Sequence, residues 1–317
     1  MEGNSLKISV IIPTRDDQGR LEYLFKSLRE QSILPDQILV VDSSSREGVL
    51  ETCKIFKADF IKISPDQFDH GGTRNFAASF AKGEVLVFVT QDAFFKDAEG
   101  LRNLIRPLED PLIAASFAKQ VPKKDANPIE IFARQFNYPS VELVKKLEDL
   151  PKLGVKTFFF SNACSAIKRS AYEEVGGFPQ KTIMNEDMFL AAKFIVKGYR
   201  IAYQPDAVVY HSHNYSLGIQ FRRYFDIGVF FCRNRWIRDL SNSEREGMRY
   251  AKEAIRFLSF NEKKKWIPYA LADIAIRFLG YRMGLSERYL PISIKKRVSL
   301  NKGFWERGIS STRKEVV

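Results

Sequence analysis

Cysteine is scarce in this chain of 317 residues, and no long apolar run interrupts its mixed composition. The three cysteines, Cys53, Cys164 and Cys232, are widely spaced and form no CxxC pair. This spacing excludes a disulfide framework or a cysteine zinc site and fits a reducing compartment. The most apolar stretch, residues 266–283, contains three charged side chains, whereas a membrane span needs about 20 mostly apolar residues. We therefore expect no spanning helix and, without a basic-then-apolar leader, no secretory signal.

Two familiar nucleotide-binding signatures are also missing. No GxGxxG pattern follows the first apolar segment, which argues against a conventional dinucleotide site, and no Walker lysine loop occurs. What is present is ample apolar material, with 45% hydrophobic and 13% aromatic residues. Such a composition supports a packed core, in one large domain or two smaller ones.

The net charge of +12 is unevenly distributed. A strongly basic balance favours polyanionic partners, namely nucleic acid, an anionic membrane surface or a phosphorylated substrate. The first 110 residues are rich in aspartate, whereas the tail beyond Arg222 is dense in lysine and arginine. A nucleic-acid binding module is disfavoured, because none of its usual motifs is present and the expected cleft is acidic.

Apolar strands alternate with amphipathic helices through the first part of the chain, which predicts an α/β fold with a mostly parallel sheet. Strands are expected at residues 8–13, 37–42, 60–63, 85–90, 158–160, 199–203 and 207–210. Helices are expected at residues 21–28, 48–56, 76–81, 169–176 and 185–195. Beyond residue 214 the pattern is helical only, with helices at 221–231, 249–260 and 267–283. We therefore predict a boundary near residue 215, with domains 1–215 and 216–317.

Residues 85–93 hold the clearest sign of a functional site. An apolar strand without polar alternation, typical of a central parallel strand, ends abruptly in Asp92. Ligands bind beyond the carboxyl ends of such strands, and Asp42 ends the strand at 37–42. Both carboxylates are thus expected at one sheet edge. The alternative is that Asp92 only caps a following helix.

Three further groups of polar residues are candidates for chemistry. The segment 70–75 is expected to be a glycine-rich loop before a helix, where Arg74 could clamp phosphate; the alternative is a plain turn with an exposed arginine. His211 and His213 follow the last expected strand, and a histidine could join Asp92 around Mg²⁺ or Mn²⁺, or be merely structural. Glu186 and Asp187 open a helix, where acidic residues are often only dipole partners.

Taken together, these motifs resemble the family 2 inverting glycosyltransferases with the GT-A fold, and most closely their bacterial rhamnosyltransferase members. The motifs that carry the resemblance occur in family order at residues 9–14, 40–43, 70–75, 90–93, 185–187 and 211–213. The resemblance is strong over roughly residues 6–215 and less specific in the helical tail. It implies that residues 1–215 form a GT-A nucleotide-sugar-binding catalytic domain, and that 216–317 form a basic helical C-terminal extension.

The resemblance also implies roles for individual residues. Asp187 matches the catalytic base, with Glu186 as its neighbour. Asp92 lies at the place of the metal-binding DxD motif, where Gln91-Asp92-Ala93 supplies one carboxylate instead of two. A histidine is then needed as well, His211 first and His213 with it, around Mg²⁺ or Mn²⁺. The residues implied to bind the donor are Pro13, Thr14, Arg15, Asp42, Gly71, Arg74, Asn75, Gln91 and Asp92.

The donor expected from the resemblance is dTDP-rhamnose, and the acceptor is a glycan hydroxyl, lipid-linked, in bacterial cell-surface polysaccharide synthesis. The basic aromatic tail fits an anionic membrane surface, which places the enzyme in the cytoplasm on the inner face of the plasma membrane. The alternative for the tail is a packed helical cap with a solvated basic face. Alternative functions are transfer from a UDP- or GDP-linked sugar, or a sugar nucleotidyltransferase. The last would need a glycine- and lysine-rich loop after the first strand, where Thr14-Arg15-Asp16-Asp17 stands.

Overall fold

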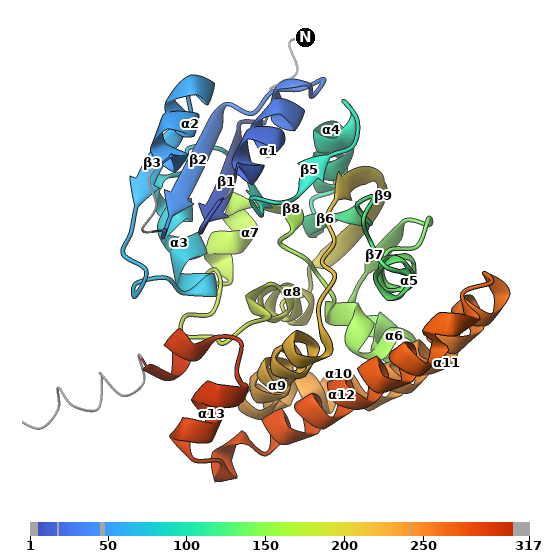
Figure 1. Cartoon of the computed structure of the whole chain (residues 1–317). Coiled ribbons are helices and arrows are strands. Elements are labelled where there is room, and N and C mark those ends of the chain that lie inside the picture. Colours follow the sequence, from blue (N-terminus) through green and yellow to red (C-terminus); the bar gives the residue numbers. More distant parts are fainter. Residues whose placement is uncertain (1–5, 18, 45–47, 242, 307–317) are drawn as a thin grey trace, which may run out of the picture.

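The computed structural model describes residues 6–306 except 18, 45–47 and 242 (Figure 1). Within these residues the centre of the molecule is a mixed sheet in the order β3-β2-β1-β4-β8-β6-β9-β5, with β7 paired to β9. Helices cover both faces of the sheet, and a layer of C-terminal helices lies along one side (Figure 1). The α/β, mostly parallel sheet expected from the sequence is confirmed.

The first half of the sheet is parallel. Its elements are β1 (Ile8–Thr14), α1 (Arg20–Arg29), β2 (Gln37–Asp42), α2 (Val49–Phe56), β3 (Asp59–Lys62), α3 (His70–Phe80) and β4 (Val85–Val89). Strand β1 pairs in parallel with both β2 and β4. All five residues of β4 are buried, because helices cover it on both faces. Burial on both faces explains why the sequence of β4 is apolar throughout, without polar alternation.

The second half of the sheet is mixed. Its elements are β5 (Phe94–Phe95), α4 (Gly100–Ile105), β6 (Ile113–Val121), α5 (Pro128–Asn137), β7 (Leu143–Lys145), α6 (Leu150–Leu153), β8 (Cys164–Lys168), α7 (Arg169–Glu174), α8 (Glu186–Val196) and β9 (Arg200–Tyr210). Short 3₁₀ segments lie at Arg106–Glu109, Leu147–Asp149 and Gly154–Phe158. Strand β8 runs antiparallel between β4 and β6, while β6 and β9 are parallel.

Three element predictions were wrong. Residues 158–160 form no strand, because a 3₁₀ segment ends at Phe158 and pairing with β4 begins at Cys164. The two short strands expected at 199–203 and 207–210 are one strand, β9, with a register shift against β6 after Ala118. The expected loop at 70–75 is the first part of α3, which is capped by Asp69.

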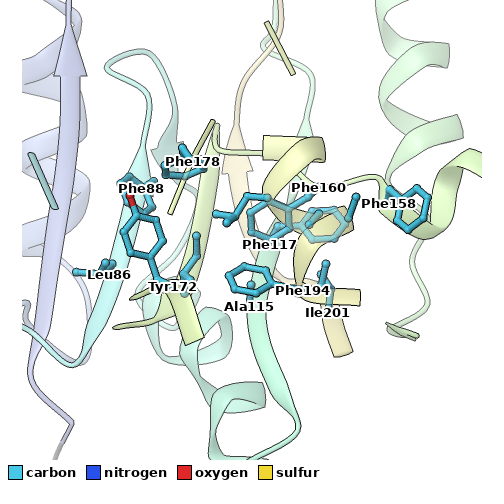
Figure 2. Packing of buried hydrophobic residues seen from close by; sticks show 14 of the residues in the cluster. Leu86, Phe88, Ala115, Phe117, Phe158, Phe160, Tyr172, Phe178, Phe194 and Ile201 are labelled. Atoms are coloured by element: carbon cyan, nitrogen blue, oxygen red, sulfur yellow. The ribbon is translucent and has the colours of Figure 1, made fainter. Parts of the chain in front are cut away.

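Two buried apolar clusters fill the two faces of the sheet. One lies under α1, α2 and α4, and the other lies under α3, α7 and α8. The second cluster is rich in aromatic rings, several of which meet edge to face (Figure 2). Phe88 and Phe178 have ring centroids 5.1 Å apart, and those of Phe117 and Phe160 are 5.5 Å apart. This packing fixes the segments before β8 and α8, where the candidate site lies.

The C-terminal helices pack onto the same core. They are α9 (Leu217–Arg233), α10 (Arg235–Ser241), α11 (Ser243–Phe260), α12 (Ile267–Leu285) and α13 (Ile292–Val298). Phe225 and Trp305 belong to the buried cluster that also contains Phe194 of α8. Helices α9 and α12 approach closely because Gly284 has no side chain. A Cβ there would lie 2.1 Å from the carbonyl oxygen of Phe225. The division at residue 215 stays a prediction, and the apolar core is continuous across it.

No described helix is long and apolar enough to cross a bilayer.

Candidate active site

The carboxyl ends of β1, β2 and β4 meet at one edge of the sheet, as the sequence predicted. Thr14 ends β1, and its hydroxyl donates to Oδ1 of Asp42 at 2.9 Å. The same carboxylate accepts from the hydroxyl of Ser44 at 2.7 Å through Oδ2, and it is almost fully buried. Pro13 pairs with Val41 just below. Thr14 and Asp42 thus form a rigid, polar corner at the sheet edge.

The side chain of Gln91 links two loops at this edge of the sheet. Its side-chain amide accepts from the backbone N–H of Arg15 at 2.8 Å and donates to the carbonyl of Arg15, also at 2.8 Å. The pair of hydrogen bonds ties the loop after β1 to the loop after β4. Asp92 follows directly, so its position is fixed relative to β1.

Asp92, His211 and His213 form one cluster, although more than a hundred residues separate Asp92 from the two histidines along the chain. Nε2 of His211 lies 3.6 Å from Oδ1 of Asp92, and Nε2 of His213 lies 3.3 Å from Oδ2. The two Nε2 atoms are 3.1 Å apart. Two ligands about 2.1 Å from an octahedral cation and at right angles lie about 3.0 Å apart, so the spacing fits a metal ion. These are the three residues predicted as metal ligands, and candidate ligand atoms of all three lie within 4.8 Å of one another.

The protonation state of His211 suits a metal ligand. Arg134, which can only donate, hydrogen-bonds to Oε1 of Gln120, and this bond fixes the orientation of the amide. Nδ1 of His211 lies 2.8 Å from the same oxygen, so Nδ1 carries the proton and Nε2 keeps its lone pair toward Asp92. Burial lowers the pKa of His211 to about 3, which keeps the ring neutral.

Helix α5 supplies support that the sequence did not reveal. Glu130 accepts from Arg134 at 2.6 Å and from the backbone N–H of His213 at 3.3 Å. The ring of Tyr215 stacks on that of His213 with centroids 5.1 Å apart. The only signal in the sequence was the four-residue spacing of Glu130 and Arg134, which is common on any helix.

The segment 70–75 is the start of helix α3, and it packs against the chain before α8. The side chain of Asp69 accepts from the backbone N–H of Gly72 at 2.7 Å, which closes the first turn. A Cβ on Gly71 would lie 1.9 Å from the carbonyl oxygen of Pro179, so only glycine allows this approach. The amide of Asn75 bonds to both backbone groups of Phe178 at 2.9 Å. Contact of Gly71 or Asn75 with a donor stays a prediction.

Arg74 points from α3 to the start of α8. Its Nη1 lies 3.2 Å from Oε1 of Glu186 and donates to the carbonyl of His70 at 2.8 Å. Glu186 is buried, which alone would raise its pKa, but the guanidinium of Arg74 lowers the pKa below its usual value. Glu186 is therefore ionised and paired with Arg74.

Asp187 differs from its neighbour in accessibility and in charge. It is partly exposed, and its two oxygens accept from the backbone N–H groups of Met188 at 2.8 Å and Asn162 at 3.3 Å. Burial, and then the negative charge of Glu186, raise the pKa of Asp187 to about 7. Two adjacent carboxyl groups whose pKa values are pushed apart are typical of acid–base sites. The accessible one, Asp187, can accept a proton near neutral pH.

A chain of hydrogen bonds joins the two centres. Gln120, which orients His211, donates to the hydroxyl of Ser161 at 2.8 Å. The next residue, Asn162, donates its backbone N–H to Asp187 and its side-chain amide to Glu186 at 3.4 Å. The structure therefore brings the Asp92–histidine cluster and the Glu186–Asp187 pair to one side of the sheet.

Several known proteins are similar to this chain. "O-antigen chain rhamnosyltransferase RfbN" of Salmonella typhimurium is 42% identical over 314 residues, which is 98% of this chain and 100% of the relative. "O-antigen chain rhamnosyltransferase WbaN" of Salmonella anatum is 41% identical over 311 residues, covering 97% of this chain and 98% of the relative.

Solved structures share the fold at low identity. A mannosyltransferase from Pyrobaculum calidifontis, in complex with GDP-Man and Mn²⁺, has a TM-score of 0.56 and 17% identity, covering 97% of this chain and 80% of the other. S. aureus TarS 1-349, in complex with UDP-GlcNAc, has a TM-score of 0.54 and 15% identity, covering 89% and 91%. The fold is thus GT-A-like. Since the family model described as Glycosyl transferase family 2 also matches residues 9–176, the chain belongs to glycosyltransferase family 2.

Proposed function

We propose that this glycosyltransferase moves L-rhamnose from dTDP-rhamnose to a hydroxyl of a lipid-linked glycan, with inversion at the anomeric carbon, in bacterial cell-surface polysaccharide synthesis. The sugar and the pathway are suggested by the two Salmonella relatives, each matched over nearly its full length. The observation that carries the chemistry is the split between Glu186, which is paired with Arg74, and Asp187, which is accessible and has a raised pKa.

The split gives Asp187 the role of general base. An acceptor hydroxyl within hydrogen-bond reach transfers its proton to Asp187 as its oxygen bonds to C1 of the sugar. The bond from C1 to the diphosphate breaks on the opposite face, and the nucleoside diphosphate leaves. The transition state develops oxocarbenium character, as in glycoside hydrolysis. The carboxylate of Glu186, held by Arg74, keeps negative charge beside the base and raises its proton affinity.

Asp92, His211 and His213 would hold the divalent cation. Their mixed nitrogen and oxygen set suits Mn²⁺ better than Mg²⁺, which prefers oxygen ligands throughout. When bound, such a cation neutralises the negative charge that develops on the departing diphosphate. Lys123, whose Nζ lies 4.0 Å from Asp92, adds a second positive charge at the same place.

The polar corner formed by Thr14 and Asp42 lies at the sheet edge where α/β folds bind nucleotides, which supports a role in holding the nucleoside. The Asp42 carboxylate already accepts from Thr14 and Ser44, so its orientation is fixed before any ligand arrives.

The test is a donor screen that measures release of nucleoside diphosphate from dTDP-rhamnose and from UDP- and GDP-linked sugars. It uses a lipid-pyrophosphate glycan acceptor, with Mn²⁺, with Mg²⁺ and with EDTA. We expect dTDP release that needs acceptor and Mn²⁺, and an inverted anomeric signal in the NMR spectrum of the product. Turnover of a UDP- or GDP-sugar alone would replace the proposed donor. A product with retained configuration would overturn the role of Asp187.

The acceptor also bears on where the enzyme works. A lipid-linked acceptor lies in the bilayer, while the nucleotide-sugar donor is a cytoplasmic metabolite. We place the enzyme in the cytoplasm, peripheral on the inner face of the plasma membrane.

A further inference from the structure

Helix α12 carries an apolar stripe that faces away from the rest of the protein. Leu271, Phe278 and Leu279 are 50%, 60% and 55% exposed. Their spacing of seven and eight residues places them on one side of the helix. The opposite side contains Gly280 and Gly284, which pack against α9. Figure 1 shows α11 and α12 along the edge of the molecule that is remote from the first strands of the sheet.

The segment that contains this stripe is rich in basic residues. Residues 261–302 contain ten lysines and arginines against three acidic residues. Two of the three, Asp273 and Glu287, are buried and paired with cations, Asp273 with Arg277 at 2.7 Å and Glu287 with Lys295 at 2.8 Å. Glu262 is the third. Residues 261–302 therefore carry a net positive charge, and Lys264, Lys265 and Arg288 are among their exposed cations.

The exposed cations stand at both ends of the stripe. Lys264 and Lys265 lie just before α12, and Arg288 follows it beside Tyr289, which is 89% exposed. Aromatic side chains at such positions are typical of the interface between headgroups and acyl chains. Lysine and arginine stems can extend along apolar surface while their charges stay in the headgroup region.

We infer that the outer face of α12, together with Lys264, Lys265 and Arg288, is the surface by which the protein docks on an anionic lipid bilayer. The inference deepens the proposed function, since that function places the acceptor in a membrane. A bilayer offers acyl chains to the apolar stripe and phosphate groups to the cations at once. A second copy of the chain is disfavoured as the occupant, because two such faces would repel each other. A nucleic acid would leave the apolar stripe without a partner.

The test measures co-sedimentation of the full chain with vesicles, without donor or acceptor. We expect binding to mixed phosphatidylglycerol–phosphatidylcholine vesicles, much weaker binding to pure phosphatidylcholine, and a loss of binding at high salt. Each basic residue near an anionic surface strengthens binding by about fivefold, so the triple variant K264Q/K265Q/R288Q should bind on the order of 100-fold more weakly. The apolar variant F278S/L279S should bind about tenfold more weakly or worse.

Two matched controls come from the opposite part of the chain. Variant K62Q/K82Q/K96Q removes three exposed lysines of the first domain, and L34S/I55S removes two apolar side chains that are 63% and 62% exposed. Both should bind vesicles as the wild type does. Thermal unfolding checks that the exposed substitutions leave the fold intact.

Three results would overturn the inference. They are equal binding to neutral and anionic vesicles, wild-type binding by K264Q/K265Q/R288Q, and a dimer in sedimentation velocity that F278S/L279S converts to monomer. The last result would assign the face to a second copy. Turnover with a water-soluble acceptor, assayed without vesicles, tests the proposed function separately, so the two failures are distinguishable.

Discussion

Replacing Asp187 with asparagine separates catalysis from donor binding and from folding. Asparagine has the same size and keeps one acceptor oxygen, so one of the two backbone hydrogen bonds, from Asn162 or Met188, survives. The carboxylate that we propose as general base is lost. Positioned bases contribute about 10²–10⁴-fold, so turnover should fall on the order of 10²-fold or more, equivalent to about 2.7 kcal/mol of barrier. Steady-state release of nucleoside diphosphate measures turnover, and calorimetry measures the donor Kd, which should change little.

The same variant should lose turnover but gain stability above neutral pH. In the folded protein the pKa of Asp187 is raised to about 7 by burial and by Glu186, whereas an unfolded aspartate titrates near its ordinary value. Folding therefore takes up a proton between those two pKa values, and the contribution of Asp187 to stability falls as pH rises toward 7. Asparagine cannot ionise. We expect D187N to unfold at a higher temperature than the wild type at pH 8, and to lose that advantage in acid.

Wild-type turnover should follow the base form of Asp187. Below its pKa of about 7, the rate should rise about tenfold for each pH unit, and D187N should lack this limb. Asp206→Asn is a matched control, because Asp206 is exposed on β9. The reasoning is refuted if D187N binds donor and turns over as the wild type does. A variant that is slower and also less stable at pH 8 would make Asp187 a structural residue.

Three further predictions test the groups that support the site. Gln120→Leu removes the partner that orients His211, so it should weaken Mn²⁺ binding by about 10–100-fold in calorimetry. The free energy of unfolding without donor should change less than the free energy of Mn²⁺ binding. Unchanged Mn²⁺ affinity would contradict this role. Gly284→Leu should lower the free energy of unfolding by about 1–3 kcal/mol or more in denaturant titration, since a Cβ there meets the Phe225 carbonyl at 2.1 Å; Gly247→Leu, at an open exposed position, is the control. Asn301→Ala should lower kcat more than it raises KM, because the Asn301 amide donates to the carbonyl of Ile183 and so positions the chain before α8; a change in unfolding alone would make it merely structural.

Much of the parallel half of the sheet could be predicted because its signals are local. The unbroken apolar runs that end in Asp42 and Asp92 indicated parallel strands, and the structure places both carboxylates at one edge. The positions of His211 and His213 after a strand could likewise be predicted from the sequence, and both side chains lie beside Asp92. In each case the informative residues are neighbours of the strand that positions them.

The rest depends on partners that are distant in the chain. Gln120 matters because it contacts Ser161 and His211, which are 41 and 91 residues away, and nothing near Gln120 indicates this. The start of α3 was misread because two glycines disfavour a helix locally. Packing against Pro179, and the cap from Asp69, override that preference. The contacts of Gln120 and of Gly71 are tertiary, whereas the Asp69 cap is a local signal that the sequence reading did not use.

The C-terminal helices are linked to the segment before Asp187, the base that we propose, by the same kind of distant contact. The side-chain amide of Asn301 donates to the carbonyl of Ile183 at 2.9 Å, in the segment that delivers Glu186 and Asp187. Its backbone N–H donates at 3.1 Å to Asp226, a buried carboxylate of α9. A displacement of α9 would therefore pull on the chain just before the base. Since α9 packs closely on α12, whose outer face we assign to the bilayer, that face and the segment before Asp187 belong to one packed core, and Asn301→Ala should lower turnover even with a soluble acceptor.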